Sequence, residues 1–250
     1  MTDSLQSHKN VDPVIITGGA QRLGLATAIA LQKLGYRVVI TYRSHRPILY
    51  DLEASGIATM YADFADEEGI HRLTGELCSR FNSVRAIIHN ASEWLQEGKH
   101  QTDESVMKRM LNTHVMAPYL INQACGDLLI HHGRKHGYAD IIHMSDYVAT
   151  NGSRKHIAYA ASKAALDNLT LSYASKLAPW VKVNSIAPAL LMFNEDDDEL
   201  YREKAMKKSL LGIVPGASEG VSTIRYLLES RYLTGKTIAL DGGRHLARAS

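Results

Sequence analysis

Near its N-terminus the sequence runs Pro13-Val14-Ile15-Ile16-Thr17-Gly18-Gly19-Ala20-Gln21-Arg22-Leu23-Gly24, and this stretch decides the fold. It starts with an apolar, β-rich run, and a helical pattern rich in Ala and Leu follows from Leu25 to Leu34, closed by Gly35. A strand, a glycine-rich turn and a helix in this order predict a dinucleotide-binding loop. The glycines let the backbone approach a pyrophosphate, and the helix N-terminus offers unpaired N–H groups. A glycine-rich loop alone is often a tight turn, so the prediction depends on the strand and helix beside it.

Apolar, β-rich runs and helical patterns alternate over the rest of the chain. The predicted strands are 13–17, 37–42, 57–61, 84–89, 139–144, 181–186 and 236–240. The predicted helices are 23–34, 47–55, 66–81, 103–131, 155–177 and 218–229. This alternation predicts the α/β class, with a Rossmann-type doubly wound parallel sheet of about seven strands and helices on both faces. Because no linker interrupts the pattern, we expect residues 1–250 to form a single domain, with a flexible polar segment at 1–11.

Composition argues against several classes of protein. The formal net charge of +2 is too small to indicate nucleic-acid or membrane binding, and no stretch approaches the length of a transmembrane helix. Cys78 and Cys125 lack metal-ligand spacing, so we expect buried thiols in a reducing compartment and a cytoplasmic protein without a signal sequence. His131, His132 and His136 fall in a polar connection, where we expect solvated side chains rather than metal ligands.

A tyrosine and a lysine stand four residues apart in Tyr159-Ala160-Ala161-Ser162-Lys163. On a helix this spacing places the two side chains on one face, one turn apart. A nearby ammonium stabilises a phenolate, so the pair can pass a proton to or from an atom that gains or loses a hydride. The spacing alone is common on solvated helices, and it indicates catalysis only together with the dinucleotide loop.

The ends of two further strands extend the predicted cofactor site. Arg43 and Ser44 follow the strand at 37–42, where an NAD site has an acid for the ribose hydroxyls. A guanidinium suits a 2′-phosphate, so the lack of an acid favours NADP(H) over the alternative of a solvated basic loop. The strand at 84–89 ends in Asn90-Ala91-Ser92, which should lie beside the glycine-rich loop.

Five motifs in this order resemble the short-chain dehydrogenase/reductase family from end to end. They are Thr17–Gly24, Asn90-Ala91, Tyr159-x-x-x-Lys163, Asn184-Ser185-Ile186-Ala187-Pro188 and Asp241-Gly242-Gly243. Within the family, the chain is similar to the pteridine reductase branch. That branch has an arginine at the middle glycine of the fingerprint, where Arg22 stands, and an Asn-Ala-Ser-x-aromatic segment like Asn90–Trp94. Asp146, thirteen residues before Tyr159, stands where most of the family has serine.

The resemblance implies a set of contacts with the cofactor NADPH. These contacts fall on Gly18, Arg22, Leu23, Gly24, Arg43, Ser44, Asp63, Phe64, Asn90, Ala91, Ser92, Tyr159, Lys163 and Pro188. Asp63 and Phe64 are expected to flank the adenine, and Arg22 to reach the phosphates rather than a surface acid. Lys163 is expected to hold the nicotinamide ribose and to lower the pKa of Tyr159.

The resemblance also implies catalytic and substrate residues. Tyr159, Lys163 and Asp146 form the expected catalytic group, and the substrate is expected to contact Ser92, Trp94, Asp146 and Tyr159. A carboxyl suits the ring nitrogens and amino group of a pterin better than a hydroxyl does, because it accepts two N–H bonds or, when protonated, donates one. For Asp146, the alternative to catalysis is a turn-capping role. For Trp94, the expected role is a stacking wall for a flat ring, and the alternative is packing in the core.

These roles imply NADPH-dependent reduction of a 7,8-dihydropterin such as dihydromonapterin, with a hydride delivered to C6 and a proton to N5. Dihydrofolate shares the reacting ring, so dihydrofolate reductase activity is expected beside it, and the motifs do not rank the two. Two other functions stay open, a carbonyl or ketoacyl reductase and a non-catalytic NADP(H) sensor. Asp146 and Trp94 speak against the first, and the retained pair of Tyr159 and Lys163 speaks against the second.

Two positions depart from the wider family pattern. His114 stands where an asparagine normally supports a water linked to the active-site lysine, which leaves the proton route open. Ala189 follows Pro188, where glycine is usual. The resemblance therefore predicts no role for His114 or Ala189.

The last expectations concern the segment after the sixth strand and the assembly. The acid run Glu195-Asp196-Asp197-Asp198-Glu199 is expected to be a solvated helix N-terminus rather than a metal site, within a substrate loop at 190–212. Family members are usually homotetramers built through the helices at 103–131 and 155–177, and the same assembly is expected here.

Overall fold

Seven parallel strands form one sheet in the order β3-β2-β1-β4-β5-β6-β7 in the computed structural model, which describes residues 12–98 and 102–247. The strands are β1 (Val14–Ile16), β2 (Val38–Tyr42), β3 (Ala58–Tyr61), β4 (Ala86–His89), β5 (Ala139–Met144), β6 (Val181–Pro188) and β7 (Thr237–Leu240). The predicted α/β class and doubly wound parallel sheet are confirmed. The segment at 1–11, predicted to be flexible, lies outside the described residues.

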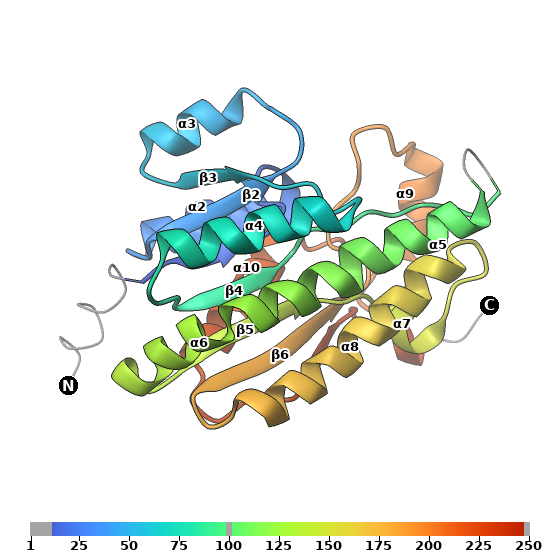
Figure 1. Ribbon diagram of the computed structural model, residues 1–250. Coiled ribbons are helices and arrows are strands. Elements are labelled where there is room, and N and C mark those ends of the chain that lie inside the picture. The colour runs from blue at the N-terminus through green and yellow to red at the C-terminus, as the bar shows by residue number, and fades with distance from the viewer. Residues whose placement is uncertain (1–11, 99–101, 248–250) are drawn as a thin grey trace.

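Helices cover both faces of this sheet (Figure 1). One face carries α4 (Glu67–Arg80), α6 (Ala117–His136) and α8 (Ile157–Leu177). The other carries α2 (Arg22–Lys33), α3 (Ile48–Ala54) and α10 (Ala217–Glu229). Each crossover between parallel strands needs a long connection, and these helices supply it.

Strand β1 shows why the sheet is apolar on both faces. Its three residues alternate, so Ile15 packs with the helices α4, α6 and α8, while Val14 and Ile16 pack with α2 and α10. All three side chains are buried. A strand buried on both faces becomes a continuous apolar run, which is the pattern that the sequence has at this point.

The long helix predicted at 103–131 is interrupted. It consists of α5 (Asp103–Leu111), a π-helical segment (Asn112–Met116) and α6, which ends at His136 and is capped by Gly137 with φ of 103°. A π-helical turn widens the helix by one residue and often marks a functional site. His114, in the middle of this segment, is buried.

Three short helices complete the fold. They are α7 (Val148–Asn151), α9 (Glu199–Met206) and the 3₁₀ helix η2 (Arg244–Leu246). The prediction of a helix start within the acid run is confirmed, because the Asp198 side chain accepts the backbone N–H of Tyr201 at 2.7 Å. Among residues 12–98 and 102–247, no helix combines the length and hydropathy that crossing a bilayer requires.

The expectation of solvated histidines on α6 is wrong for His136, whose side chain is 8% exposed, and for His132. This side chain is 2% exposed, and its Nδ1 lies 2.7 Å from Oδ2 of Asp12. Potential ligand atoms of Asp12, His132 and His136 lie within 4.8 Å of one another, as in many metal sites. Since Oδ2 of Asp12 already bonds to both His132 and the hydroxyl of Ser83, we assign the group a structural role that joins the start of β1 to α6.

The two cysteines also differ from the expectation. Cys125 is a buried thiol, as predicted, but Cys78 is exposed. The prediction of burial for Cys78 is therefore wrong. The helical pattern of α4 placed this residue beside the buried Leu77, and one position is enough to turn a side chain from core to solvent.

Candidate active site

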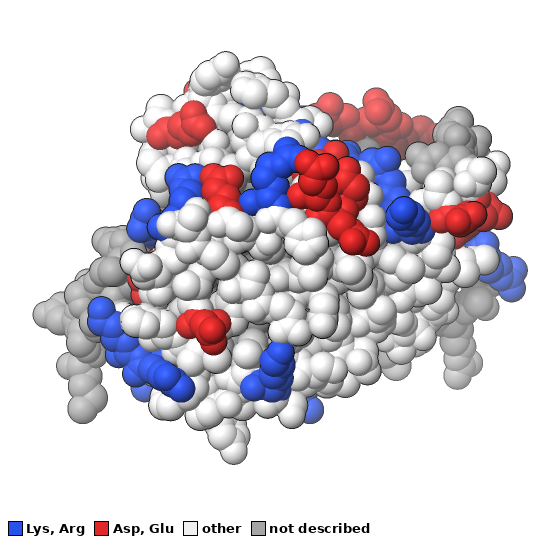
Figure 2. All heavy atoms as spheres, viewed as in Figure 1, with Lys and Arg blue, Asp and Glu red and all other residues white. Residues whose placement is uncertain are grey.

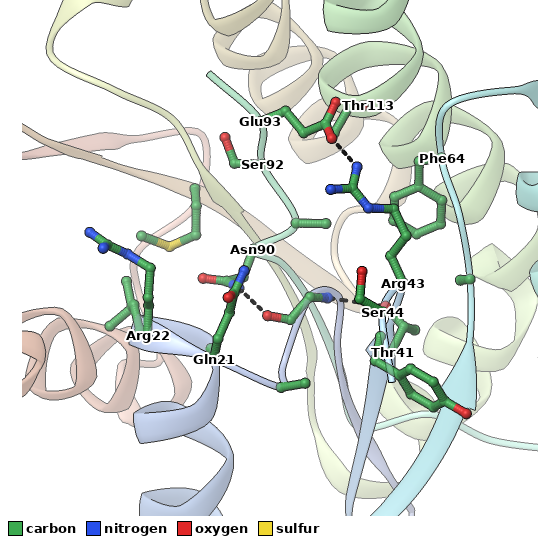
Figure 3. Close-up of a pocket in the computed structure, with 18 of the residues that line it drawn as sticks. Gln21, Arg22, Thr41, Arg43, Ser44, Phe64, Asn90, Ser92, Glu93 and Thr113 are labelled. Atoms are coloured by element: carbon green, nitrogen blue, oxygen red, sulfur yellow. Dashed lines mark hydrogen bonds and ion pairs between the residues drawn. The ribbon is translucent and has the colours of Figure 1, made fainter. Parts of the chain in front are cut away.

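A cavity of about 340 Å³ lies at the carboxyl ends of the central strands. The loop after β1, the end of β2 and the segment after β4 form one part of it, and the segment after β5 and α8 form the other. Figure 3 shows the first part, with Asn90 between Arg22 and Arg43. This is the position at which open parallel sheets bind ligands, because the strand order reverses there.

The glycine-rich loop is shaped so that its backbone faces this cavity. Gly18 has φ of 65°, and a Cβ at Gly24 would lie 2.5 Å from both Nδ2 of Asn90 and the carbonyl of Gly18. Nδ2 of Asn90 donates to the carbonyls of Thr17 and Gly18, each at 3.0 Å. A side chain at either glycine would break this close approach, so the loop requires glycine there.

Helix α2 starts at the edge of the same cavity. Its N-cap residue, Gln21, makes no side-chain capping hydrogen bond, which leaves the first backbone N–H groups of the helix for an anion. The glycine cradle and this helix start together fit the pyrophosphate of a dinucleotide.

Arg43 and Ser44 line the cavity at the end of β2. The guanidinium of Arg43 forms an ion pair with Glu93 (Figure 3). The carboxylate of Glu93 also accepts from Arg109 at 2.8 Å. The end of β2 therefore presents positive charge to the cavity, with Glu93 as a counter-ion. Asp63 and Phe64, after β3, line the same region.

Three groups meet on the other side of the cavity. The phenol of Tyr159 donates to Oδ2 of Asp146 at 2.8 Å. Oδ1 of Asp146 accepts the backbone N–H of Val148 at 2.9 Å, so the carboxyl both caps its turn and faces the tyrosine. Nζ of Lys163, on the same helix as Tyr159, donates to the carbonyl of Met144 at 2.7 Å and lies 5.5 Å from the centre of the phenol ring.

Burial shifts the pKa of all three groups. Burial lowers the pKa of Lys163 to about 8, although the carboxylates of Asp146 and Asp167 oppose that change. Burial also raises the pKa of Asp146, although the hydrogen bond that its carboxylate accepts from the backbone N–H of Val148 opposes that change. Burial and the neighbouring Asp146 raise the pKa of Tyr159 well above 10. The expected lowering of the Tyr159 pKa by Lys163 is therefore wrong for this arrangement, which keeps the phenol protonated.

Arg22 is directed across the cavity mouth rather than along the glycine loop. Its φ is 50°, a conformation that residues with a side chain seldom adopt, which explains why glycine is usual there. Its guanidinium donates to Oδ1 of Asn194 at 2.6 Å and to the carbonyl of Met192 at 3.4 Å. Arg22 thus connects the fingerprint loop to the segment at 190–212.

His114 lies under this site and is 1% exposed. Its Nε2 lies 2.9 Å from Oγ of Ser92 and 3.3 Å from the backbone nitrogen of Glu93. Its Nδ1 lies 2.8 Å from Oγ of Ser162. Burial, together with the charge of Lys163, lowers the pKa of His114 well below 6.5, so the imidazole is neutral.

A family model described as short chain dehydrogenase matches residues 12–198. The chain belongs to this family. Dihydromonapterin reductases from Enterobacter sp. (strain 638) and Klebsiella pneumoniae are each 50% identical to it over 94% of this chain and 97% of theirs. The crystal structure of FolM alternative dihydrofolate reductase 1 from Brucella canis, complexed with NADP, has a TM-score of 0.82 and 28% identity. That alignment covers 97% of each chain.

In this short-chain dehydrogenase, nearly every residue predicted for the site lines the one cavity. They are Gly18, Arg22, Leu23, Gly24, Arg43, Ser44, Asp63, Phe64, Asn90, Ala91, Ser92, Asp146, Tyr159, Lys163 and Pro188. Trp94 is outside the cavity lining, 62% exposed and stacked on His156 with ring centres 4.0 Å apart. Its exposure contradicts the alternative of core packing, and the stacking wall for a flat ring stays a prediction.

Sequence analysis missed several residues at the edge of the site. Glu93 and Thr113 line the cavity, Met192 closes it beside Arg22, and Arg109 lies behind Glu93. The prediction included Glu93 only as an unassigned position of the Asn-Ala-Ser-x-aromatic segment. An acidic residue there, close to a predicted phosphate-binding arginine, was the one available indication of a counter-ion.

Proposed function

We propose that this chain is an NADPH-dependent reductase of 7,8-dihydropterins, with dihydromonapterin as the preferred substrate and dihydrofolate as a poorer one. The observation that carries the proposal is the hydrogen bond of 2.8 Å between the phenol of Tyr159 and the carboxyl of Asp146 at the cavity wall. A hydroxyl at that position would serve a ketone oxygen, whereas a carboxyl can serve a ring nitrogen.

The residues of the cavity fit NADPH. The glycine cradle and the start of α2 suit the pyrophosphate, and Arg43 with Ser44 suits the 2′-phosphate. Lys163, buried in the N-terminal part of α8 and bonded to Met144 at the carboxyl end of β5, suits the nicotinamide ribose hydroxyls. When bound, NADPH supplies the hydride for C6 of the substrate.

The contribution of the chain is the proton for N5. Tyr159 holds a proton because its pKa is raised, and the hydrogen bond to Asp146 fixes the direction of the phenol. The raised pKa of Asp146 brings the carboxyl closer to the range in which it can itself carry a proton. Both acids face the cavity, so a ring nitrogen placed there can receive the proton of Tyr159, and a protonated Asp146 can then return a proton to the phenolate.

Turnover of a small panel of substrates tests the proposal. We expect kcat/KM with NADPH to be highest for dihydromonapterin, measurable for dihydrofolate, and at least about tenfold lower for aromatic and aliphatic ketones. The measurement is NADPH oxidation with purified protein, with product identity checked by chromatography. Ketones reduced faster than either dihydropterin would favour a carbonyl reductase, and no turnover with any substrate would favour a nucleotide sensor.

The role proposed for Arg43 has its own test. Arg43→Ala should raise the Kd of NADPH by about tenfold or more and change that of NADH little, because the guanidinium interacts with the 2′-phosphate. Fluorescence titration of the reduced cofactors measures both constants. Arg72→Ala, at an exposed arginine of α4 outside the cavity lining, is the control. An equal loss for both cofactors would contradict the assignment.

We further propose a homotetramer in the cytoplasm, assembled through α5, α6 and α8. The supporting observations are few charged side chains over α6 and α8 (Figure 2) and several large apolar side chains exposed on these helices. The exposed side chains are Met107, Leu111, Tyr119, Ile157 and Leu171. The exposed free thiol of Cys78 fits a reducing compartment. Light scattering of the purified protein should give four times the chain mass, and a monomer would contradict the assembly.

The segment at 190–212 is proposed to cover the substrate. Its Met192 lines the cavity, and Asn194 accepts from Arg22. Backbone hydrogen bonds hold the segment near its two ends, between Leu191 and Gly216 and between Leu211 and Gly242, so we expect the part between them to move over the cavity.

A further inference from the structure

The residue that the family pattern leaves unexplained is His114, and its hydrogen bonds fix which ring nitrogen carries the proton. The backbone N–H of Glu93 points to Nε2 at 3.3 Å, and a backbone N–H can only donate. Nε2 is therefore an acceptor. The ring is neutral, so the proton is on Nδ1.

The other side of the ring gives the same answer. Oγ of Ser162 donates to the backbone carbonyl of Tyr159 at 2.7 Å, which uses its only proton. The contact of 2.8 Å between this hydroxyl and Nδ1 of His114 must then be a donation from the imidazole. Two independent hydrogen bonds thus assign the same tautomer.

This tautomer determines what Ser92 offers to the cavity. Because Nε2 of His114 is an acceptor, the hydroxyl of Ser92 donates to it at 2.9 Å. The lone pairs of the Ser92 oxygen remain for the groups that face it in the cavity, which are the phenol of Tyr159 and a ligand. We infer that His114 is a positioning residue that makes Ser92 a hydrogen-bond acceptor toward the substrate and so selects substrates with an N–H group over ketones.

The inference rests on the proposed function, since a dihydropterin carries ring N–H and amino groups and a ketone carries only an acceptor oxygen. An asparagine at this position has a shorter side chain with one donor and one acceptor, so it cannot span both Ser92 and Ser162. His114 lies within the π-helical segment at 112–116, and its ring forms a T-shaped pair with the Tyr159 ring, 5.3 Å between centres.

Two substitutions separate the two ends of the imidazole. The side-chain amide N–H of an asparagine can replace Nδ1 as a donor, and the side-chain amide oxygen of a glutamine can replace Nε2 as an acceptor. His114→Asn keeps the donor to Ser162 but loses the acceptor for Ser92, whereas His114→Gln keeps the acceptor. We expect His114→Asn to lower kcat/KM for dihydromonapterin by about tenfold, the scale of one hydrogen bond, with the Kd of NADPH unchanged. His114→Gln should retain most of the activity.

Ser92→Ala completes a double-mutant cycle. It should cause the same loss as His114→Asn, and the double variant Ser92→Ala/His114→Asn should lose no more than either single variant. Additive losses, a fully active His114→Asn, or equal losses in His114→Asn and His114→Gln would overturn the inference.

The tautomer itself can be observed without any substrate. Long-range ¹H–¹⁵N spectra of protein labelled at histidine, with His114→Gln to assign the signals, should show a protonated Nδ1 and a bare Nε2 between pH 6 and 8. A protonated Nε2 overturns the inference whatever the protein reduces. Wild-type protein that shows the expected tautomer but does not reduce dihydropterins would instead overturn the proposed function.

Discussion

Asp146 performs two tasks with one carboxyl group. Oδ1 accepts from the backbone of its own turn, while Oδ2 faces the phenol of Tyr159. The local bond holds the group in position, so the bond to Tyr159 needs no further ordering of the side chain. Both roles weighed from the sequence, turn capping and a place beside the phenol, are thus present in the geometry.

Removing either proton-carrying group should slow chemistry without releasing the cofactor. We predict that Tyr159→Phe and Asp146→Asn each lower kcat for dihydromonapterin by about 10²–10⁴-fold, the usual contribution of a positioned acid. Asn can still accept the N–H of Val148, so the turn should persist. Steady-state kinetics and NADPH titration separate the two quantities. A variant that kept wild-type kcat would show that its group is not the acid.

The pH profile should identify Lys163. Burial lowers the pKa of this lysine to about 8, so its positive charge is lost as pH rises through that value. Tyr159 remains protonated there because its pKa is raised. We therefore predict that kcat/KM falls above about pH 8.

A second variant tests the origin of that fall. The carboxylate of Asp167 raises the pKa of Lys163, so Asp167→Asn should move the decline to lower pH. Rates measured from pH 6 to 10 test both statements. A profile that stays flat to pH 10, or a decline that Asp167→Asn does not move, would contradict the assignment to Lys163.

Among single residues, the sequence predicted those site residues that belong to contiguous motifs. The motif residues converge on one cavity because the carboxyl ends of parallel strands share one edge. Contacts between distant residues could not be predicted. Glu93 pairs with Arg43 across 50 positions, and no local pattern joins them. The stacking of Trp94 on His156 could not be predicted for the same reason, since His156 lies on a different segment.

Among the elements, α6 packs against the end of α8 and the turn that follows it through two glycines with different surroundings. A Cβ at Gly133 would lie 2.1 Å from the carbonyl of Trp180, whereas a Cβ at Gly126 meets only Leu177, at 3.9 Å. The first glycine is required by close packing, and the second is not. The two form a matched pair on one helix.

We predict opposite effects for alanine at these two positions. Gly133→Ala should destabilise the fold by about 1–3 kcal/mol, the usual effect of overpacking. Gly126→Ala should leave stability unchanged or raise it by up to about 1 kcal/mol, because alanine favours the helix. Urea denaturation gives both free energies of unfolding. Equal values for the two variants would mean that α6 can shift away from Trp180.

Element positions followed from the sequence to within a few residues, but two kinds of feature did not. The π-helical segment at 112–116 lies within an unbroken helical pattern, and one extra residue in a turn changes no residue type. The helix α7 has four residues, which is too short for a helical period to appear. Both features depend on what the segment packs against.

For the molecule as a whole, buried histidines set the response to acid. Burial lowers the pKa of His89 and His132 to about 4 and that of His143 well below 6.5. The unfolded chain binds protons near pH 6.5, so between pH 6.5 and 4 it holds more protons than the folded chain. Stability is therefore fully present above pH 6.5 and is lost as pH falls.

We predict a steep fall of the melting temperature between pH 6.5 and 4.5, measured by calorimetry or dye fluorescence. His89→Gln removes one of the groups and should make the fall less steep, because glutamine can still donate to Asn122. His131→Gln, at an exposed position, is the control and should follow the wild-type profile. A melting temperature independent of pH in this range would show that these histidines are already protonated in the folded state.

The overall architecture was the most predictable property. Strands apolar on both faces, alternating with amphipathic helices, leave few arrangements other than a doubly wound sheet. Solvation of individual histidines and cysteines was less predictable, because a helix buries one side chain and exposes the next.

The strand order also constrains events during synthesis on the ribosome. The binding cavity draws on residues from Gly18 to Met192, and β1 lies between β2 and β4. A nascent chain that has emerged only as far as β3 has the glycine-rich loop. It still lacks β4, the strand on the other side of β1, and the cavity walls that later residues form. NADPH can therefore stabilise the polypeptide only after most of it has been translated, and the earlier stages must depend on packing alone or on chaperones.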